Sequence, residues 1–142
     1  MTGFSSEWLA LREPYDLAAR NTTVLDAVLA AFRGQGSISV VDLACGTGAT
    51  LRAIGKRLPA RQSWRLVDND IGLLGTAATL GRPPEVTVTA RAVDLVRDLE
   101  LALDGPVDLI TTSALLDLVS EDWLERLLVE ARAEHRHVVE ED

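Results

Sequence analysis

A glycine-containing turn and an isolated carboxylate are the residues whose types and spacing first suggest chemistry. Gly46 and Gly48 follow a short apolar run, and glycine there lets the chain turn sharply and lets a ligand approach the backbone. Asp68 ends the next apolar run, roughly 20 residues after Gly46. A carboxylate at that distance can accept hydrogen bonds from both hydroxyls of a ribose. The pattern therefore indicates a site for a nucleoside-containing cofactor.

Each of these features also has a purely structural explanation. Two glycines alone are a weak motif and also occur in ordinary strand-to-helix turns. Asp68 would be a bystander if Asn69 or Asp70 capped the helix that follows. A dinucleotide site favours a third glycine, which would stand at the position of Leu51. A glycine there lets the helix pack closely against the strand beneath a pyrophosphate. Leu51 thus counts against NAD or FAD as the cofactor, although a dinucleotide stays an open alternative.

The elements that must position these residues alternate between strands and helices. Apolar runs with β-branched residues predict strands near 38–43, 64–68, 86–94 and 107–113, and a doubtful fifth strand at 137–142. Helices are expected over 49–58 and 70–80 and after a cap at Ser120. This alternation predicts an α/β fold with a mostly parallel sheet, in which ligands bind beyond the carboxyl ends of the strands.

Length and composition fit one globular domain, residues 1–142. The chain has 47% hydrophobic and 25% charged residues, which argues against disorder. Its formal net charge of −8 argues against a broad nucleic-acid-binding surface. No apolar run approaches the roughly 18 residues of a spanning helix, and no secretory signal pattern stands at the N-terminus. With the lone Cys45, which has no partner for an internal disulfide, these features predict a cytoplasmic protein. No metal site is expected.

The first glycine turn resembles motif I of the class I S-adenosylmethionine-dependent methyltransferases. In the segment 40–48, Asp42 matches the acidic position of that motif. Gly46 and Gly48 match its last two glycines, and Ala44 replaces the first. The resemblance implies a three-layer Rossmann-like sandwich with strand order 3-2-1-4-5 and S-adenosyl-L-methionine as the cofactor.

Three later segments resemble further motifs of the same family, in the family's order, so that the likeness runs over about 38–130. Asp68 matches the residue that holds the ribose, and Asp94 the polar residue that meets the adenine. The segment 107–117 resembles the fourth-strand motif that lines the methionine end. The cofactor-binding residues implied in this way are Asp42, Ala44, Cys45, Gly46, Thr47, Gly48, Asp68, Asn69, Asp94, Leu95 and Ser113.

The two ends of the chain carry further expectations. The resemblance implies that residues 1–36 form a helical lid over the core 37–142, with Arg20 as a candidate partner of the cofactor carboxylate. A solvated helix face is the plainer explanation for Arg20. The family usually has seven strands, so a sheet lacking its C-terminal strands is expected, with an exposed edge through which a homo-oligomer could form.

The activity expected from the resemblance is methyl transfer to a small-molecule acceptor. No strand-end residue stands out as a general base, so the sequence assigns no catalytic residue and no particular acceptor. Two alternatives remain open: a non-catalytic cofactor-binding or partner-dependent protein of the same fold, and an NAD-type dinucleotide-binding domain.

Overall fold

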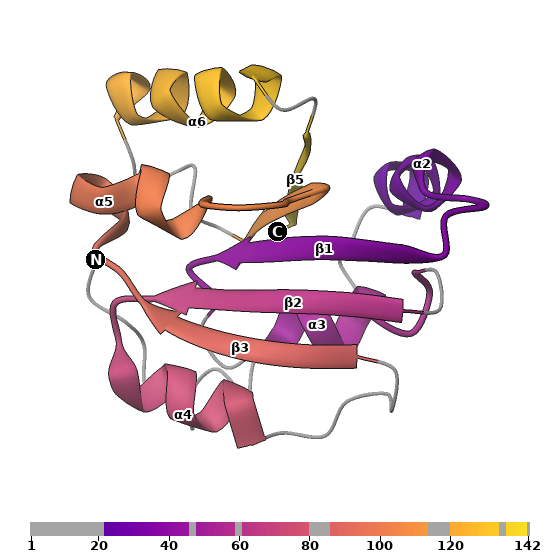
Figure 1. Cartoon of the computed structure of the whole chain (residues 1–142), viewed down its shortest axis with the longest axis horizontal. Coiled ribbons are helices and arrows are strands. Elements are labelled where there is room, and N and C mark those ends of the chain that lie inside the picture. Colours follow the sequence, from indigo (N-terminus) through magenta and orange to yellow (C-terminus); the bar gives the residue numbers. More distant parts are fainter. Residues whose placement is uncertain are drawn as a thin grey trace.

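The computed structural model describes residues 22–45, 48–58, 61–79, 86–113, 120–133 and 136–141. Its centre is a parallel sheet of five strands in the order β3-β2-β1-β4-β5 (Figure 1). The strands are β1 (Ser37–Leu43), β2 (Arg61–Asp68), β3 (Val86–Ala92), β4 (Leu109–Ser113) and β5 (His137–Glu141). The helices are α2 (Thr22–Ala31), α3 (Ala49–Ile54), α4 (Ile71–Thr79), α5 (Leu95–Ala102) and α6 (Glu121–Ala133).

Helices cover both faces of the sheet, which gives the three layers expected (Figure 1). Val40 of β1 packs in one cluster with side chains of α3 and α4, such as Leu51 and Leu74. The neighbouring Val41 packs in a second cluster with side chains of α5 and α6. Successive residues of a strand point to opposite faces, so β1 must be apolar on both sides. The pairing of the strands confirms the predicted parallel order 3-2-1-4 of the first four strands.

Two interactions fix β1 against β4 at either end of their pairing. Near the start of β1, the Ser39 amide donates to Asp108 Oδ2 at 2.8 Å, and the Asp108 amide donates back to the Ser39 carbonyl at 2.8 Å. Near its end, the Thr111 hydroxyl donates to Asp42 Oδ1 at 2.8 Å, and both side chains are fully buried. Parallel pairing places the carboxyl ends of β1, β2 and β4 at the same edge of the sheet.

The structure corrects the sequence-based assignment after β3. The third strand ends at Ala92, and Asp94 caps a helix, α5, that the sequence reading did not predict. Leu95, Leu99 and Ala102 form the buried face of this helix, at the spacing of an amphipathic helix. Asp98 has non-helical dihedral angles (φ −120°, ψ 35°), so α5 is kinked near its middle. The helix expected over 49–58 is also shorter, because α3 ends at Ile54.

The predictions for the two ends of the chain concern the fifth strand and the N-terminal helical lid. β5 adds to β4 in parallel, with Ile110 opposite Val138. Most of the expected lid, residues 1–21 with Arg20, lies outside the described residues, which begin at α2. Among the described helices, none combines the length and the hydropathy needed to cross a membrane.

Candidate functional site

The turn after β1 is fixed by backbone hydrogen bonds. Ala44 adopts a left-handed conformation (φ 56°), which is uncommon for a residue with a Cβ atom. The Cys45 amide then donates to the Val67 carbonyl of β2 at 3.0 Å, and the Gly48 amide donates to the Cys45 carbonyl at 2.9 Å. Gly46 and Thr47 lie outside the described residues. The turn is thus anchored to the neighbouring strand immediately before α3 begins.

Gly48 occupies a position in this turn that other residues would strain. Its φ of 85° is left-handed, and it caps the N-terminus of α3. A Cβ atom there would lie 3.4 Å from Arg52 Nη1 and 3.5 Å from the Ala77 Cβ atom. These are ordinary van der Waals distances, so it is the left-handed conformation, and not the neighbours, that favours glycine at this position.

Two predicted site residues are buried: Asp42 near the end of β1 and Cys45 within the turn. Asp42 is fully buried, and its bond with Thr111 ties β1 to β4. Cys45 is 7% exposed, and burial, followed by the charges of Asp42 and Asp68, raises the pKa of its thiol far above the usual range. A thiol that stays protonated is a poor nucleophile, in keeping with the interpretation of Cys45 as a packing residue.

Asp68 and Asp70 have different roles at the end of β2, because only Asp70 caps the helix that follows. Asp68 is 6% exposed; its Oδ1 atom accepts from the Asp70 amide at 3.0 Å, and its carbonyl accepts from the Val93 amide at 3.1 Å. The side chain that caps α4 belongs to Asp70, whose Oδ1 atom accepts from the Leu73 amide at 3.0 Å. Helix capping therefore does not account for the carboxylate of Asp68.

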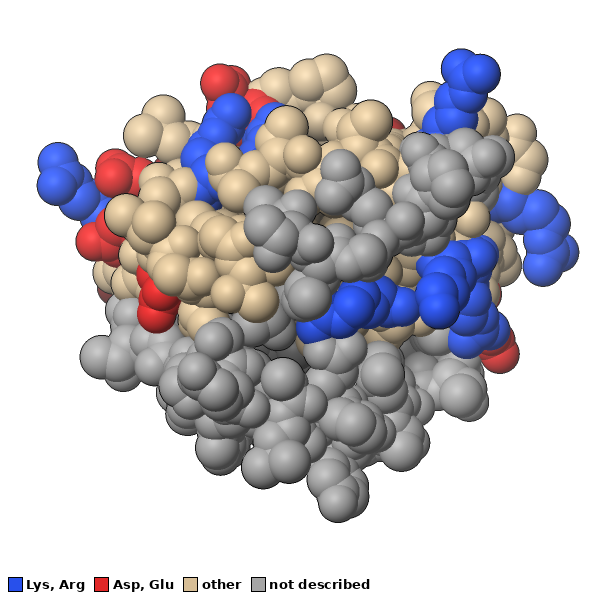
Figure 2. Space-filling model, turned by 90° about the horizontal axis from the view of Figure 1, so that it is seen from below, with Lys and Arg blue, Asp and Glu red and all other residues tan. Residues whose placement is uncertain are grey.

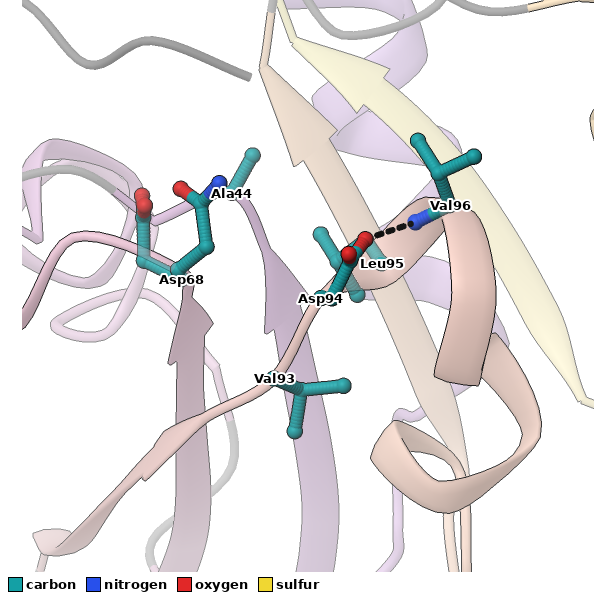
Figure 3. Close-up of a pocket in the computed structure, with 7 residues that line it drawn as sticks. Ala44, Asp68, Val93, Asp94, Leu95 and Val96 are labelled. Atoms are coloured by element: carbon teal, nitrogen blue, oxygen red, sulfur yellow. Dashed lines mark hydrogen bonds between the residues drawn. The ribbon is translucent and has the colours of Figure 1, made fainter.

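The ends of β1, β2 and β3 enclose a hollow in which most of the described candidate residues meet. Figure 3 shows Ala44 and Asp68 on one side of it and Asp94, Leu95 and Val96 on the other. We call this the strand-end hollow; its lining residues are Ala44, Asp68, Asn69, Val93, Asp94, Leu95 and Val96. It combines carboxylates with apolar side chains, as a site for a nucleoside requires: acceptors for hydroxyl groups and an apolar surface for a base.

Asp94 has a structural role within this hollow. Its Oδ1 atom accepts from the Val96 amide at 3.1 Å and from the Arg97 amide at 3.3 Å, which caps the N-terminus of α5. A carboxylate at that end also interacts favourably with the helix dipole. The same residue thus shapes the wall of the hollow and is itself exposed.

Helix α6 holds this wall in place through side chains that the sequence reading did not assign to the site. The Trp123 indole donates to the Leu95 carbonyl at 2.6 Å in a buried position. Arg126 Nη1 donates to the Val96 carbonyl at 2.6 Å, and its Nε and Nη2 atoms bind both oxygens of Glu100, at 2.9 and 2.8 Å. The bond to Arg126 lowers the pKa of Glu100. The spacing of Asp94, Leu95 and Leu99 was the signal that could have revealed α5.

The acidic side chains are unevenly distributed over one face of the molecule. Figure 2 shows Asp and Glu side chains gathered towards the left end of one face, the end at which the strands of Figure 1 finish. Lys and Arg side chains lie at both ends of this face, some of them beside these carboxylates. A cationic ligand would be attracted by the carboxylates of Asp68 and Asp94, which line the strand-end hollow.

The remaining candidates are only partly placed. Ser113 is the last residue of β4, at the same edge of the sheet as Asp68, but its side chain lies outside the described part. Arg20 lies outside it altogether. Among the described residues, no group of three His, Cys, Asp or Glu side chains is arranged to hold a metal ion.

The chain matches a protein-family model over most of its length. A family model described as "Methyltransferase domain" matches residues 40–136, the region that contains the turn, Asp68, Asp94 and all of α5 and α6. The search of curated proteins found no match.

The comparison with solved structures finds similar folds at low sequence identity. One is a protein from Methanococcus maripaludis assigned to the S-adenosyl-L-methionine-dependent methyltransferases (13% identity, TM-score 0.59, 99% of this chain and 67% of that one). Another is a cyclopropane-fatty-acyl-phospholipid synthase-like protein from Lactobacillus casei (16%, 0.53, 87% and 54%). A third is coclaurine N-methyltransferase bound to N-methylheliamine and S-adenosylhomocysteine (21%, 0.53, 83% and 33%). The chain spans between one third and two thirds of the length of these structures.

Proposed function

The chain belongs to the methyltransferase domain family, and from this premise we propose that it binds S-adenosylmethionine and transfers its methyl group to a small-molecule acceptor. The observation that carries the proposal is the strand-end hollow, where a nearly buried carboxylate, Asp68, stands beside the turn after β1 and opposite Asp94.

The residues of the hollow fit the parts of this cofactor. Asp68 would accept hydrogen bonds from the ribose hydroxyls, since its carboxylate is not the cap of α4. Asp94, with Val93, Leu95 and Val96 beside it, would receive the base between a polar group and apolar side chains. Coclaurine N-methyltransferase, which shares the fold, is bound to the demethylated form of the cofactor.

The turn after β1 would face the amino-acid part of the cofactor. Gly48 leaves the approach to the N-terminus of α3 free of a side chain, and its conformation is fixed by the bond to Cys45. Asp42 acts beneath the surface, because its bond to Thr111 positions the strand from which the turn leaves. Asn69 belongs to the proposed site because it lines the hollow. We include Ser113, Arg20, Gly46 and Thr47 by resemblance alone.

The cofactor supplies a methyl group that its positively charged sulfur already activates. The chain then has to bind the cofactor and the acceptor, align them with each other and exclude water. In this way an enzyme lowers the barrier of a reaction whose reagent is already activated. The carboxylates of Asp68 and Asp94 in the lining of the hollow favour a cation. A small acceptor is supported by the formal net charge of −8, which disfavours a nucleic acid.

Calorimetry with S-adenosylhomocysteine tests the binding step. We expect saturable binding to the parent chain and a loss of about tenfold or more in Asp68→Asn, because a charge-assisted hydrogen bond is removed. Asp26→Asn is the matched control: it removes the same charge from an exposed pair with Arg57 on another element and should bind as the parent does.

Two results would contradict the proposal. One is absence of binding to the parent protein, and the other is equal affinity in the parent and Asp68→Asn. Competition with NAD then separates the dinucleotide alternative, which requires NAD to bind where S-adenosylhomocysteine does not. Release of S-adenosylhomocysteine in the presence of panels of small acceptors tests the transfer step separately from binding.

A further inference from the structure

Three arginines from separate elements converge on the loop that follows α5. Arg65 belongs to β2, Arg91 to β3, and Arg136 directly precedes β5. Each donates one hydrogen bond to a backbone carbonyl at the end of α5 or in the loop: Arg65 to Ala102 at 2.8 Å, Arg91 to Leu101 at 3.0 Å and Arg136 to Gly105 at 3.0 Å. We call these three residues the arginine cluster. It lies at the end of α5 remote from the strand-end hollow.

Among the described residues, no carboxylate forms an ion pair with a guanidinium group of the arginine cluster. The ion pairs of the described residues involve other arginines, Arg57, Arg97 and Arg126. Burial and the charge of Arg91 lower the pKa of Arg65, and Arg136 acts in the same direction, against the opposing charge of Asp104. The repulsion among the three cations is thus only partly offset, in a chain that has 22 acidic residues to place.

One residue of the arginine cluster also has hydrogen-bond donors that are not used within the described part of the chain. The Nε and Nη1 atoms of Arg136 are buried and have no hydrogen-bond partner in the part of the chain that the structure describes. A buried donor without a partner is costly, and such groups in folded proteins call for a water molecule or an ion.

Capping of α5 accounts for part of this arrangement. Cations near the C-terminus of a helix bind its last carbonyls and favour its dipole. That role uses one donor of each guanidinium, whereas each has five. It explains neither the gathering of three guanidinium groups nor the unpartnered donors of Arg136.

We propose that the arginine cluster binds a small oxyanion, namely inorganic phosphate or the phosphate group of a monoester. A guanidinium presents its donors in a planar fork that matches phosphate oxygens. A dianion placed among the three groups replaces their mutual repulsion with attraction and gives the spare donors acceptors. Because α5 connects this end to the wall of the strand-end hollow, the anion would also steady the helix that lines the hollow.

Titration with inorganic phosphate at constant ionic strength, with chloride as the replaced anion, tests this proposal. Calorimetry gives the affinity, and amide NMR shifts show whether Asp104 and Gly105 respond. We expect saturable binding in the parent and a loss of about tenfold or more in Arg91→Gln and in Arg136→Gln, as for removal of a charged hydrogen bond. Lys56→Gln, which removes one exposed positive charge from the opposite layer, is the matched control and should bind as the parent does.

A parallel titration with phenyl phosphate separates the two sources of the phosphate group, since tighter binding of the monoester favours an organic ligand. The proposal is overturned if phosphate and chloride have the same effect, if shifts occur away from the α5–β4 loop, or if Lys56→Gln weakens binding as much as the cluster variants do. Arg91 is exposed, so its substitution keeps the test valid if Arg136→Gln fails to fold.

Discussion

The two ends of α5 are capped by side chains of opposite charge, and they differ in how fully those side chains are paired within the chain. At the N-terminal end a single carboxylate, Asp94, accepts from two amides, while Trp123 and Arg126 hold the carbonyls of the same turn. At the C-terminal end three guanidinium groups donate to three carbonyls. Both arrangements suit the helix dipole. The N-terminal end is fixed by bonds within the chain, whereas the C-terminal end keeps donors to spare.

The largest effect is expected from breaking the N-terminal end at Trp123. Trp123→Ala removes a side chain that is 2% exposed together with its bond to Leu95, and should lower the free energy of unfolding by about 3–5 kcal/mol. Urea denaturation measures this. Leu128→Ala, on the same helix but 44% exposed, is the control and should change stability much less. Equal losses in both variants would show that Trp123 does not anchor α5.

A smaller effect is expected from removing the cap. Asp94→Ala leaves the Val96 and Arg97 amides without their acceptor and should cost about 1 kcal/mol of stability. Asp94→Asn keeps most of the cap, so it separates capping from any contact with the cofactor. If Asp94→Asn is as stable as the parent but binds S-adenosylhomocysteine more weakly, both roles of the residue are supported; unchanged affinity would limit Asp94 to the cap.

The Arg126–Glu100 pair should give a still smaller, pH-dependent effect. The bond to Arg126 lowers the pKa of Glu100 in the folded protein. The stabilisation is therefore complete above the unfolded pKa of about 4.3 and is lost as the pH falls through the lower folded value. Urea denaturation across this range should show the parent losing its advantage over Glu100→Gln. A difference that does not change with pH would contradict this account.

The smallest effect is expected from Arg91→Gln at the other end of α5. Loss of the bond to Leu101 is offset by weaker repulsion of Arg65, so stability without phosphate should change by no more than about 0.5 kcal/mol. Thermal unfolding checks this. A large loss of stability would mean that Arg91 mainly caps the helix, which would blur the contrast between the two ends.

The sheet could be predicted from the sequence because its strands carry strong local signals. The apolar run around Val40 predicts a strand buried on both faces, and the run around Leu66 predicts a second strand that ends at Asp68. The strand order followed from the family resemblance and agrees with the structure. Ser120 caps α6 as expected, by accepting from the Trp123 amide at 3.2 Å.

What escaped prediction depends on contacts between distant segments. Helix α5 is short and kinked, and its stability relies on Trp123 and Arg126, which follow it by a whole strand. No local sequence pattern predicts the arginine cluster, because Arg65, Arg91 and Arg136 come together only after β2, β3 and β5 have formed the sheet. Local patterns report elements, whereas these features arise from their packing.

The pairing of β1 with β4 has a consequence for how the chain acquires its fold. The Ser39–Asp108 and Asp42–Thr111 contacts each join residues 69 positions apart. One side of the central strand therefore stays open during synthesis until the ribosome has released the segment around Ile110. Such long-range parallel pairing slows folding and leaves an unpaired strand exposed to association with other chains. Completion of the sheet's centre is thus expected to be a late, rate-limiting event in the maturation of the protein.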